Sequence, residues 1–174
     1  MSETIRVMYP EEKVDAKIVE MAKKISEDLN GEPVKIVCIL KGACFFACEL
    51  AKRITVPVFI DFMSVSSYGD ETESSGTVRI LKDLDSSVKG ENVLIVEDII
   101  DSGRTLKYLV DNMQSRGAKS VKLCTLLSKP DRRVVDVAVD YIGYEIPDAF
   151  VVGYGLDYAQ KYRNLPYIGI VEFD

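Results

Sequence analysis

The chain has 174 residues, of which 47% are hydrophobic and 29% are charged, as expected for one ordinary globular domain. Its 28 acidic and 22 basic residues give a net charge of -6, which disfavours nonspecific binding to nucleic acid. It contains no histidine. This excludes Ser-His-Asp and Cys-His catalysis, so any general base must be a carboxylate, lysine, tyrosine or thiolate.

The start of the chain gives no sign of export. The first twenty residues are charged throughout, and no apolar run approaches the ~18 residues that a membrane helix needs. We therefore expect no membrane contact and a cytoplasmic location. The cysteines lie in or beside apolar segments and are expected to be buried, reduced thiols: Cys38, Cys44, Cys48 and Cys124.

Apolar spacing predicts a helix, a strand and a second helix in the first third of the chain. Apolar residues recur at helical spacing over residues 14–29 and stop at Asn30-Gly31, a helix-ending pair. A β-branched run at residues 34–40 predicts a strand buried on both faces. Lys41-Gly42 follows it, and then a helical pattern continues through Arg53.

The same reasoning continues along the chain. Further strands are predicted at residues 56–62, 92–97 and 120–127. A helix is predicted at residues 105–116, ended by Gly117. The polar stretch at residues 66–77 predicts either a long mobile lid or an ordinary solvated hairpin. Residues 142–174 are rich in Tyr, Pro and Gly, which indicates short strands and turns.

Alternating strands and helices predict a single α/β domain over residues 1–174. Its sheet is expected to be mainly parallel and flanked by helices on both faces. Ligands in such sheets bind beyond the carboxyl ends of the strands. Candidate chemistry is therefore sought at those ends.

The strongest local candidate is the segment of residues 93–105. A buried strand leads into Glu97-Asp98, a carboxylate pair able to accept hydrogen bonds from a sugar diol or to hold hydrated Mg²⁺. Gly103 permits a tight turn, in which backbone amides with Ser102 and Thr105 can surround a monophosphate. The alternative is an ordinary helix start capped by Asp and Ser, after a solvated acidic pair.

The sequence VLIVEDIIDSGRT at residues 93–105 resembles the phosphoribosyl pyrophosphate motif of type I phosphoribosyltransferases, in the form found in hypoxanthine-guanine phosphoribosyltransferases. Leu40-Lys41-Gly42 resembles the pyrophosphate loop of that family, and Ser67-Tyr68 resembles a pair in its mobile lid. Residues 150–158, FVVGYGLDY, resemble its purine-binding segment. The resemblance extends from about residue 34 to the end of the chain.

The resemblance implies a phosphoribosyltransferase-like fold, with a core at about residues 30–140. A small purine-binding hood would form from the C-terminal segment, about residues 142–174, together with N-terminal residues. It also implies an enzyme of purine salvage that uses Mg²⁺ and forms a homodimer or homotetramer. Its substrates would be phosphoribosyl pyrophosphate and hypoxanthine or guanine, with no nucleic acid as partner.

The implied site has three parts. Glu97 and Asp98 would hold the ribose hydroxyls, directly or through Mg²⁺, and Asp101 would be the general base at purine N7. The 5′-phosphate would bind to Asp101, Ser102, Gly103, Arg104 and Thr105. Pyrophosphate would contact Lys41, Gly42 and Arg163, with Asp157 as a further Mg²⁺ contact. In the family the peptide before that lysine is often cis, so Leu40-Lys41 is the bond to inspect.

The purine would be read by residues outside the motif. Lys129 is implied to contact the exocyclic oxygen at position 6, and its donors predict rejection of adenine. Phe150 would stack on the ring, and Val151, with Asp157, would offer backbone carbonyls. Alternatives from the residues alone are a solvated surface lysine and a core phenylalanine. The rival functions are a xanthine phosphoribosyltransferase, or a phosphoribosyl pyrophosphate-sensing regulator on the same fold.

Overall fold

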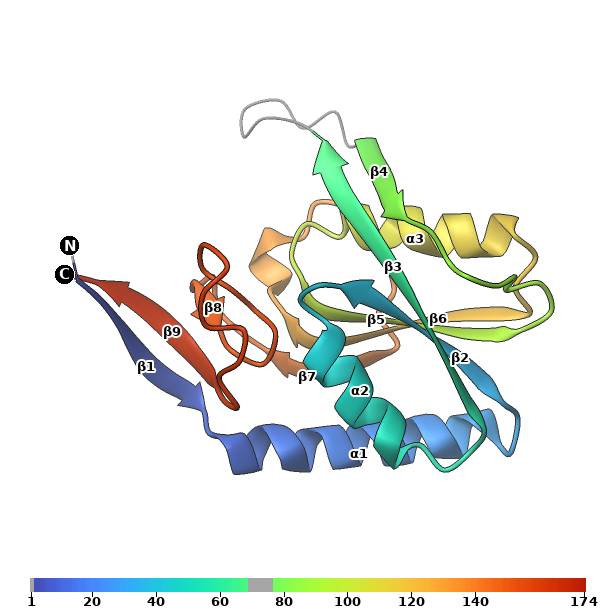
Figure 1. The fold of residues 1–174 in the computed structure, drawn as a ribbon, viewed down its shortest axis with the longest axis horizontal. Helices are drawn as coiled ribbons and strands as arrows, with labels where there is room; N and C mark the ends of the chain where they lie inside the picture. The colour runs from blue at the N-terminus through green and yellow to red at the C-terminus, as the bar shows by residue number, and fades with distance from the viewer. Residues whose placement is uncertain (1, 69–76) are drawn as a thin grey trace.

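A six-stranded sheet forms the centre of the molecule, in the order β4-β3-β2-β5-β6-β7 (Figure 1). The computed structural model describes residues 2–68 and 77–174. The strands are β2 (Val34–Leu40), β3 (Val58–Tyr68), β4 (Thr77–Lys82), β5 (Asn92–Ile100), β6 (Ser120–Ser128) and β7 (Tyr141–Glu145). All neighbours pair in parallel except β3 and β4, which are antiparallel. The predicted α/β fold with a mainly parallel sheet is confirmed.

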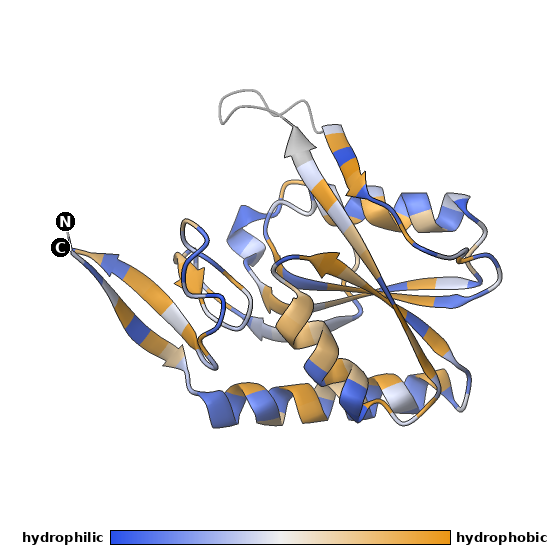
Figure 2. Ribbon diagram, viewed as in Figure 1, coloured by the Kyte–Doolittle hydropathy of each residue, from blue (hydrophilic) through white to orange (hydrophobic). Residues whose placement is uncertain are grey.

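Helices cover both faces of this sheet, because alternate residues of the buried strands point to opposite sides. In β2, Ile36 and Cys38 join the core cluster beneath α1 (Glu11–Leu29) and α2 (Cys44–Arg53). Val37 and Ile39 join the cluster beneath α3 (Arg104–Ser115) on the other face. Figure 2 shows the consequence as apolar central strands beside helices banded in polar and apolar residues.

The helix predicted for residues 14–29 is confirmed as α1, which begins earlier, directly after Pro10. Asn30 at its end has a φ of 47° and Gly31 a φ of 85°. Both lie in the left-handed region that terminates helices, as the Asn-Gly pair predicted. The predicted helix at residues 105–116 is likewise confirmed as α3, followed by Gly117 with a φ of 84°.

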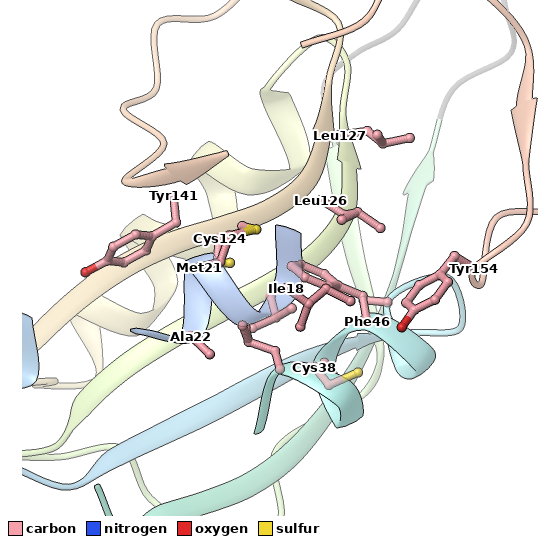
Figure 3. Close-up of a cluster of buried hydrophobic side chains, with 14 of the residues drawn as sticks. Ile18, Met21, Ala22, Cys38, Phe46, Cys124, Leu126, Leu127, Tyr141 and Tyr154 are labelled. Carbon is pink, nitrogen blue, oxygen red and sulfur yellow. The ribbon is translucent and has the colours of Figure 1, made fainter. Parts of the chain in front are cut away.

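A second, three-stranded sheet lies beside the first, in the order β1-β9-β8. It joins β1 (Glu3–Tyr9) to β9 (Ile168–Phe173) and β8 (Val151–Val152) by antiparallel pairing. Tyr154, from the C-terminal segment, enters the same core cluster as Ile18 and Phe46 (Figure 3). The short strands and turns predicted for residues 142–174 are confirmed. The N-terminal strand had no separate prediction, since its partner lies at the other end of the chain.

The boundary predicted for the hood needs correction. β7 pairs in parallel with β6 and so belongs to the central sheet, although most of its residues fall in the range 142–174.

The polar stretch at residues 66–77 also differs from a simple loop. β3 runs to Tyr68 and β4 starts at Thr77, with Ser66 opposite Arg79 in an antiparallel ladder. This favours the hairpin alternative at both ends of the stretch, and residues 69–76 lie outside the described part.

Among the described residues, no helix is long and apolar enough to cross a membrane. All four cysteines are free, but only Cys38 and Cys124 are fully buried, and Cys48 is exposed. The expectation that all four are buried is therefore wrong for Cys48, which lies in α2 but is not among its buried residues.

Candidate active site

The order of the strands reverses between β2 and β5. From β2 the chain adds β3 on one side, whereas β5 and then β6 follow on the other. Such a switch point opens a crevice at the carboxyl ends of the two strands, where ligands of α/β proteins bind. Lys41 and Gly42 follow β2, while Glu97 and Asp98 lie near the end of β5. The sheet thus brings together two motifs that are distant in the sequence.

Gly42 and Asp98 are in direct contact at this crevice. A Cβ atom on Gly42 would lie 1.9 Å from Oδ2 of Asp98, which is far inside van der Waals contact. Only glycine fits there without displacing the carboxylate. The neighbouring Leu40–Lys41 peptide bond is cis, as the family resemblance suggested. The turn after β2 therefore lies directly against the acidic pair.

Glu97 and Asp98 form a half-buried acidic pair. The amide of Asp98 donates a hydrogen bond to Oε1 of Glu97 at 3.1 Å, and the amide of Ile99 donates to Oδ1 of Asp98 at 2.7 Å. Burial and the adjacent charge of Asp98 raise the pKa of Glu97 well above its usual value. Burial also raises the pKa of Asp98, against the opposing charge of Arg163. A cation or hydroxyl donors at this pair would relieve the repulsion.

A tight loop connects β5 to α3. Gly103, with a φ of 87°, stands at the N-cap position and has no side chain with which to cap the helix. Of the two caps considered, Ser102 is found at the helix start, where its Oγ accepts a hydrogen bond from the amide of Arg104 at 3.3 Å. The positive end of the α3 dipole faces this loop and favours a small anion, and Thr105 lies in its first turn.

Arg133 fixes this loop to the end of β6. Its Nε donates to the carbonyl oxygen of Asp101 at 3.1 Å, and its Nη2 donates to Oγ of buried Ser128 at 2.9 Å. The amide of Val134 also donates to the carbonyl oxygen of Ser102, at 3.0 Å. Sequence reasoning missed Arg133, because two adjacent arginines in a polar stretch are typical of a solvated surface.

Lys129 directly follows β6 and is held inside the site. Its side chain is only 12% exposed, so the alternative of a solvated surface lysine is wrong. Its Nζ lies 3.9 Å from Oδ1 of Asp101 and 3.6 Å from Oδ1 of Asp148. Its amide donates to the carbonyl oxygen of Ile100 at 3.0 Å, which places it beside the end of β5. Asp148 was not predicted, since only the fold brings it to Lys129.

The C-terminal segment adds a basic cluster at the Gly42 side of the crevice. Nη2 of Arg163 lies 3.2 Å from Oδ1 of Asp157 and donates to Oε1 of Gln160 at 3.1 Å. The same Oε1 accepts a hydrogen bond from Nζ of Lys41 at 3.5 Å. A Cβ atom on Gly155 would lie 1.9 Å from the carbonyl oxygen of Gly42, so the two segments touch. Lys41, Asp157 and Arg163 are thus brought together, through a glutamine that sequence reasoning missed.

Phe150 is half-exposed, and the alternative of a core phenylalanine is therefore wrong. Its ring meets Tyr158 edge to face, with centroids 5.5 Å apart. The next residue, Val151, is buried in β8, where it pairs with Ile170 of β9. About half of an aromatic side chain, just before β8, is thus open to solvent. Flat apolar ligands are suited to such a surface.

The predicted lid pair can be located only in part. The backbone of Ser67 and Tyr68 forms the last two residues of β3 and pairs with Val78 and Thr77 of β4. The rest of the predicted lid, residues 69–76, lies outside the described residues. The role of Ser67 and Tyr68 as site residues therefore stays a prediction.

The sequence profile of the phosphoribosyl transferase domain matches residues 9–159 of this chain. The hypoxanthine-guanine phosphoribosyltransferase of Bacillus subtilis is 50% identical over 167 residues, which cover 96% of this chain and 93% of that protein. A bifunctional protein of Listeria monocytogenes, TilS/HprT, is 53% identical over 167 residues. The chain spans only 26% of the length of that longer relative.

Solved structures agree in fold. A hypoxanthine phosphoribosyltransferase from Staphylococcus aureus superposes with a TM-score of 0.93 at 48% identity, covering 96% of this chain and 91% of that one. A hypoxanthine-guanine phosphoribosyltransferase from Bacillus anthracis also has a TM-score of 0.93, at 46% identity, covering 99% of this chain and all of that one. The likeness therefore includes both sheets.

Proposed function

The chain belongs to the phosphoribosyl transferase domain family, and we propose that it is a purine salvage enzyme acting on a 6-oxopurine, hypoxanthine or guanine. The bond from C1′ of phosphoribosyl pyrophosphate to the pyrophosphate oxygen breaks, and a bond from C1′ to purine N9 forms. The products are IMP or GMP and pyrophosphate. Since the reaction builds positive charge on the sugar, the site must stabilise the leaving group and exclude water.

The distance of 3.9 Å between Nζ of Lys129 and Oδ1 of Asp101 is the observation that best supports this proposal. In a 6-oxopurine, O6 and N7 are neighbours on one edge of the ring. Recognition of that edge needs a donor beside an acceptor. Lys129 would donate to O6, and Asp101 would take the proton at N7 as general base. The 6-amino group of adenine would face the ammonium donor against donor.

We assign the ribose phosphate to the ends of β5 and the loop after it. Glu97 and Asp98 would accept hydrogen bonds from the ribose hydroxyls. The 5′-phosphate would bind at the start of α3, to the loop of Asp101, Ser102, Gly103, Arg104 and Thr105. Pyrophosphate would lie across the crevice, against the cluster that contains Lys41, Gly42 and Arg163.

The purine ring would stack on the exposed face of Phe150. Backbone carbonyls of Val151 and Asp157 would accept hydrogen bonds from the other edge of the ring. The ring would then lie between the second sheet and the end of β6. The C-terminal segment after β7 would accordingly serve as the purine-binding part of a single phosphoribosyltransferase domain.

The acidic residues present fit Mg²⁺. Within residues 2–68 and 77–174, no three acidic or cysteine side chains converge on one point, so Glu97, Asp98 and Asp157 form no ready-made cage. Mg²⁺ keeps several waters and is commonly bound by one or two carboxylates plus substrate oxygens. Glu97 and Asp98, whose pKa values are raised by burial, would hold it, and it would neutralise charge on the leaving pyrophosphate.

We further propose a cytoplasmic homodimer or homotetramer. The free cysteines agree with a reducing compartment. Large apolar side chains on β3 and α2 are exposed and would suit a contact between subunits: Phe45, Phe59 and Ile60. A regulatory role is not favoured, since the similar proteins are named as enzymes.

One assay tests the proposal. The protein is incubated with phosphoribosyl pyrophosphate, Mg²⁺ and, separately, hypoxanthine, guanine, xanthine, adenine and uracil, and nucleotide is measured by chromatography. Product from hypoxanthine or guanine, and none from adenine or uracil, is expected. Product from xanthine alone would point to the rival transferase. Binding of phosphoribosyl pyrophosphate without product from any base would point to the regulator.

A further inference from the structure

Lys129 lies between two carboxylates that come from opposite sides of the site. Asp101 follows β5, whereas Asp148 lies on the turn between β7 and β8. The two Oδ1 atoms are 3.9 and 3.6 Å from Nζ, beyond the reach of a good direct hydrogen bond. The ammonium is thus attracted by both carboxylates and forms a close hydrogen bond with neither.

Asp148 is held in place from outside. Its Oδ2 lies 3.3 Å from Nη1 of Arg132, while its Oδ1 faces Lys129. The turn that contains it is fixed by the backbone, because the amide of Ile146 donates to the carbonyl oxygen of Ser128 at 2.8 Å. The backbone and Arg132 therefore both contribute to its position, in addition to Lys129.

We propose that Asp148 is a positioning residue that holds the ammonium of Lys129 at the place where purine O6 binds. This inference rests on the proposed function and adds a specificity determinant to it. Asp148 draws Lys129 away from Asp101, so the proposed base is not closed into a tight ion pair. Arg132 orients Asp148 by occupying its second oxygen.

The alternative is that the pair Lys129–Asp148 only stabilises the fold. Asp148 and Arg132 are 50% and 57% exposed, and ion pairs at such exposure contribute little to stability. Lys129 is only 12% exposed, so its position is sensitive to its few neighbours. Loss of Asp148 would leave Asp101 as its remaining acidic neighbour within 4 Å, among the described residues. The ammonium would then shift toward the base and away from the purine oxygen.

The test compares Asp148→Asn, Asp148→Glu and the control Asp131→Asn in the full chain. Asp131 is exposed, lies two residues after Lys129 and makes no ion pair within the described residues. In Asp148→Asn, we expect KM for hypoxanthine or guanine to rise about ten-fold or more, since a small misplacement of a recognition group is costly. KM for phosphoribosyl pyrophosphate should stay unchanged, and Asp148→Glu should recover part of the loss.

An Arg132→Gln variant adds a second check. It should raise the purine KM in the same direction but less, because Asp148 loses its orientation and keeps its charge. A purine KM in Asp148→Asn equal to that of Asp131→Asn would overturn the inference. So would an equal rise in KM for both substrates, which indicates a general structural change. Absence of nucleotide from the parent protein would instead overturn the proposed function, and the inference with it.

Discussion

Gly42 packs directly against Asp98 at the switch point of the sheet. A Cβ atom on the glycine would lie 1.9 Å from Oδ2 and 2.8 Å from Cγ of the aspartate. The contact joins the turn after β2 to the acidic pair on β5. The glycine leaves no room there for a side chain unless the carboxylate of Asp98 shifts. Two parts of the proposed phosphoribosyl pyrophosphate site are therefore in direct contact.

Gly42→Ala should weaken activity through this contact. The new methyl group must displace Asp98 or the turn, so we expect a loss of roughly 10²-fold in kcat/KM for phosphoribosyl pyrophosphate, typical of a displacement of about 1 Å. Thermal unfolding of Gly42→Ala, Asp98→Ala and the double variant forms a cycle. The glycine substitution should cost less stability when Asp98 is already alanine. Additive costs would contradict the direct clash.

Asp101→Asn should remove the proposed general base while retaining its shape. We expect phosphoribosyl transfer to slow by about 10²-fold or more, with little change in binding of phosphoribosyl pyrophosphate. Single-turnover kinetics with pre-bound substrate separate the two effects. The exposed Asp136→Asn variant is the control for a general change in charge. Unchanged turnover in Asp101→Asn would refute the base assignment.

Lys129→Gln should narrow the discrimination between 6-oxopurines and adenine. An amide can donate to O6 or accept from an amino group, whereas an ammonium can only donate. We expect kcat/KM for hypoxanthine to fall roughly 10- to 100-fold, within the usual cost of a lost polar contact to substrate. Competition assays with both bases measure the ratio. Lys89→Gln, at an exposed position, should leave the ratio unchanged.

Glu97→Gln should make the free protein more stable at neutral pH. Burial raises the pKa of Glu97 in the folded state. The protonated side chain therefore makes its full contribution to stability only below the pKa that it has in the unfolded chain, about 4.3. That contribution is lost as the pH rises through the higher folded pKa. At pH 7.5 the variant should melt roughly 2–4 °C higher than the parent, equivalent to about 1 kcal/mol. At pH 4 the two proteins should melt at the same temperature.

Calorimetry without Mg²⁺ or substrate provides this measurement. The exposed Glu145→Gln is the matched control and should show no such pH dependence. A lower melting temperature for Glu97→Gln at pH 7.5 would mean that the carboxylate stabilises the free protein, contrary to the prediction. Added Mg²⁺ should stabilise the parent more than Glu97→Gln, if the acidic pair binds it.

The sequence alone determined the elements and motifs that depend on near neighbours. The buried run of β2, the Asn30-Gly31 helix end and the loop after β5 follow from local spacing and backbone preferences. Residues 93–105 are contiguous, so the resemblance of this segment was visible without a fold. These local signals were sufficient for the α/β class and for the family.

Only the tertiary structure decided which distant side chains meet. In the sequence, Lys129 cannot be distinguished from a surface lysine. In the fold, the end of β6 and the turn between β7 and β8 place it between Asp101 and Asp148. Likewise, Gln160 contacts the site only because the fold brings the C-terminal segment next to Lys41. Hydrophobic periodicity specifies which face of an element is buried, but not its neighbours. Those contacts arise when the whole core packs, and they determine the geometry of the site.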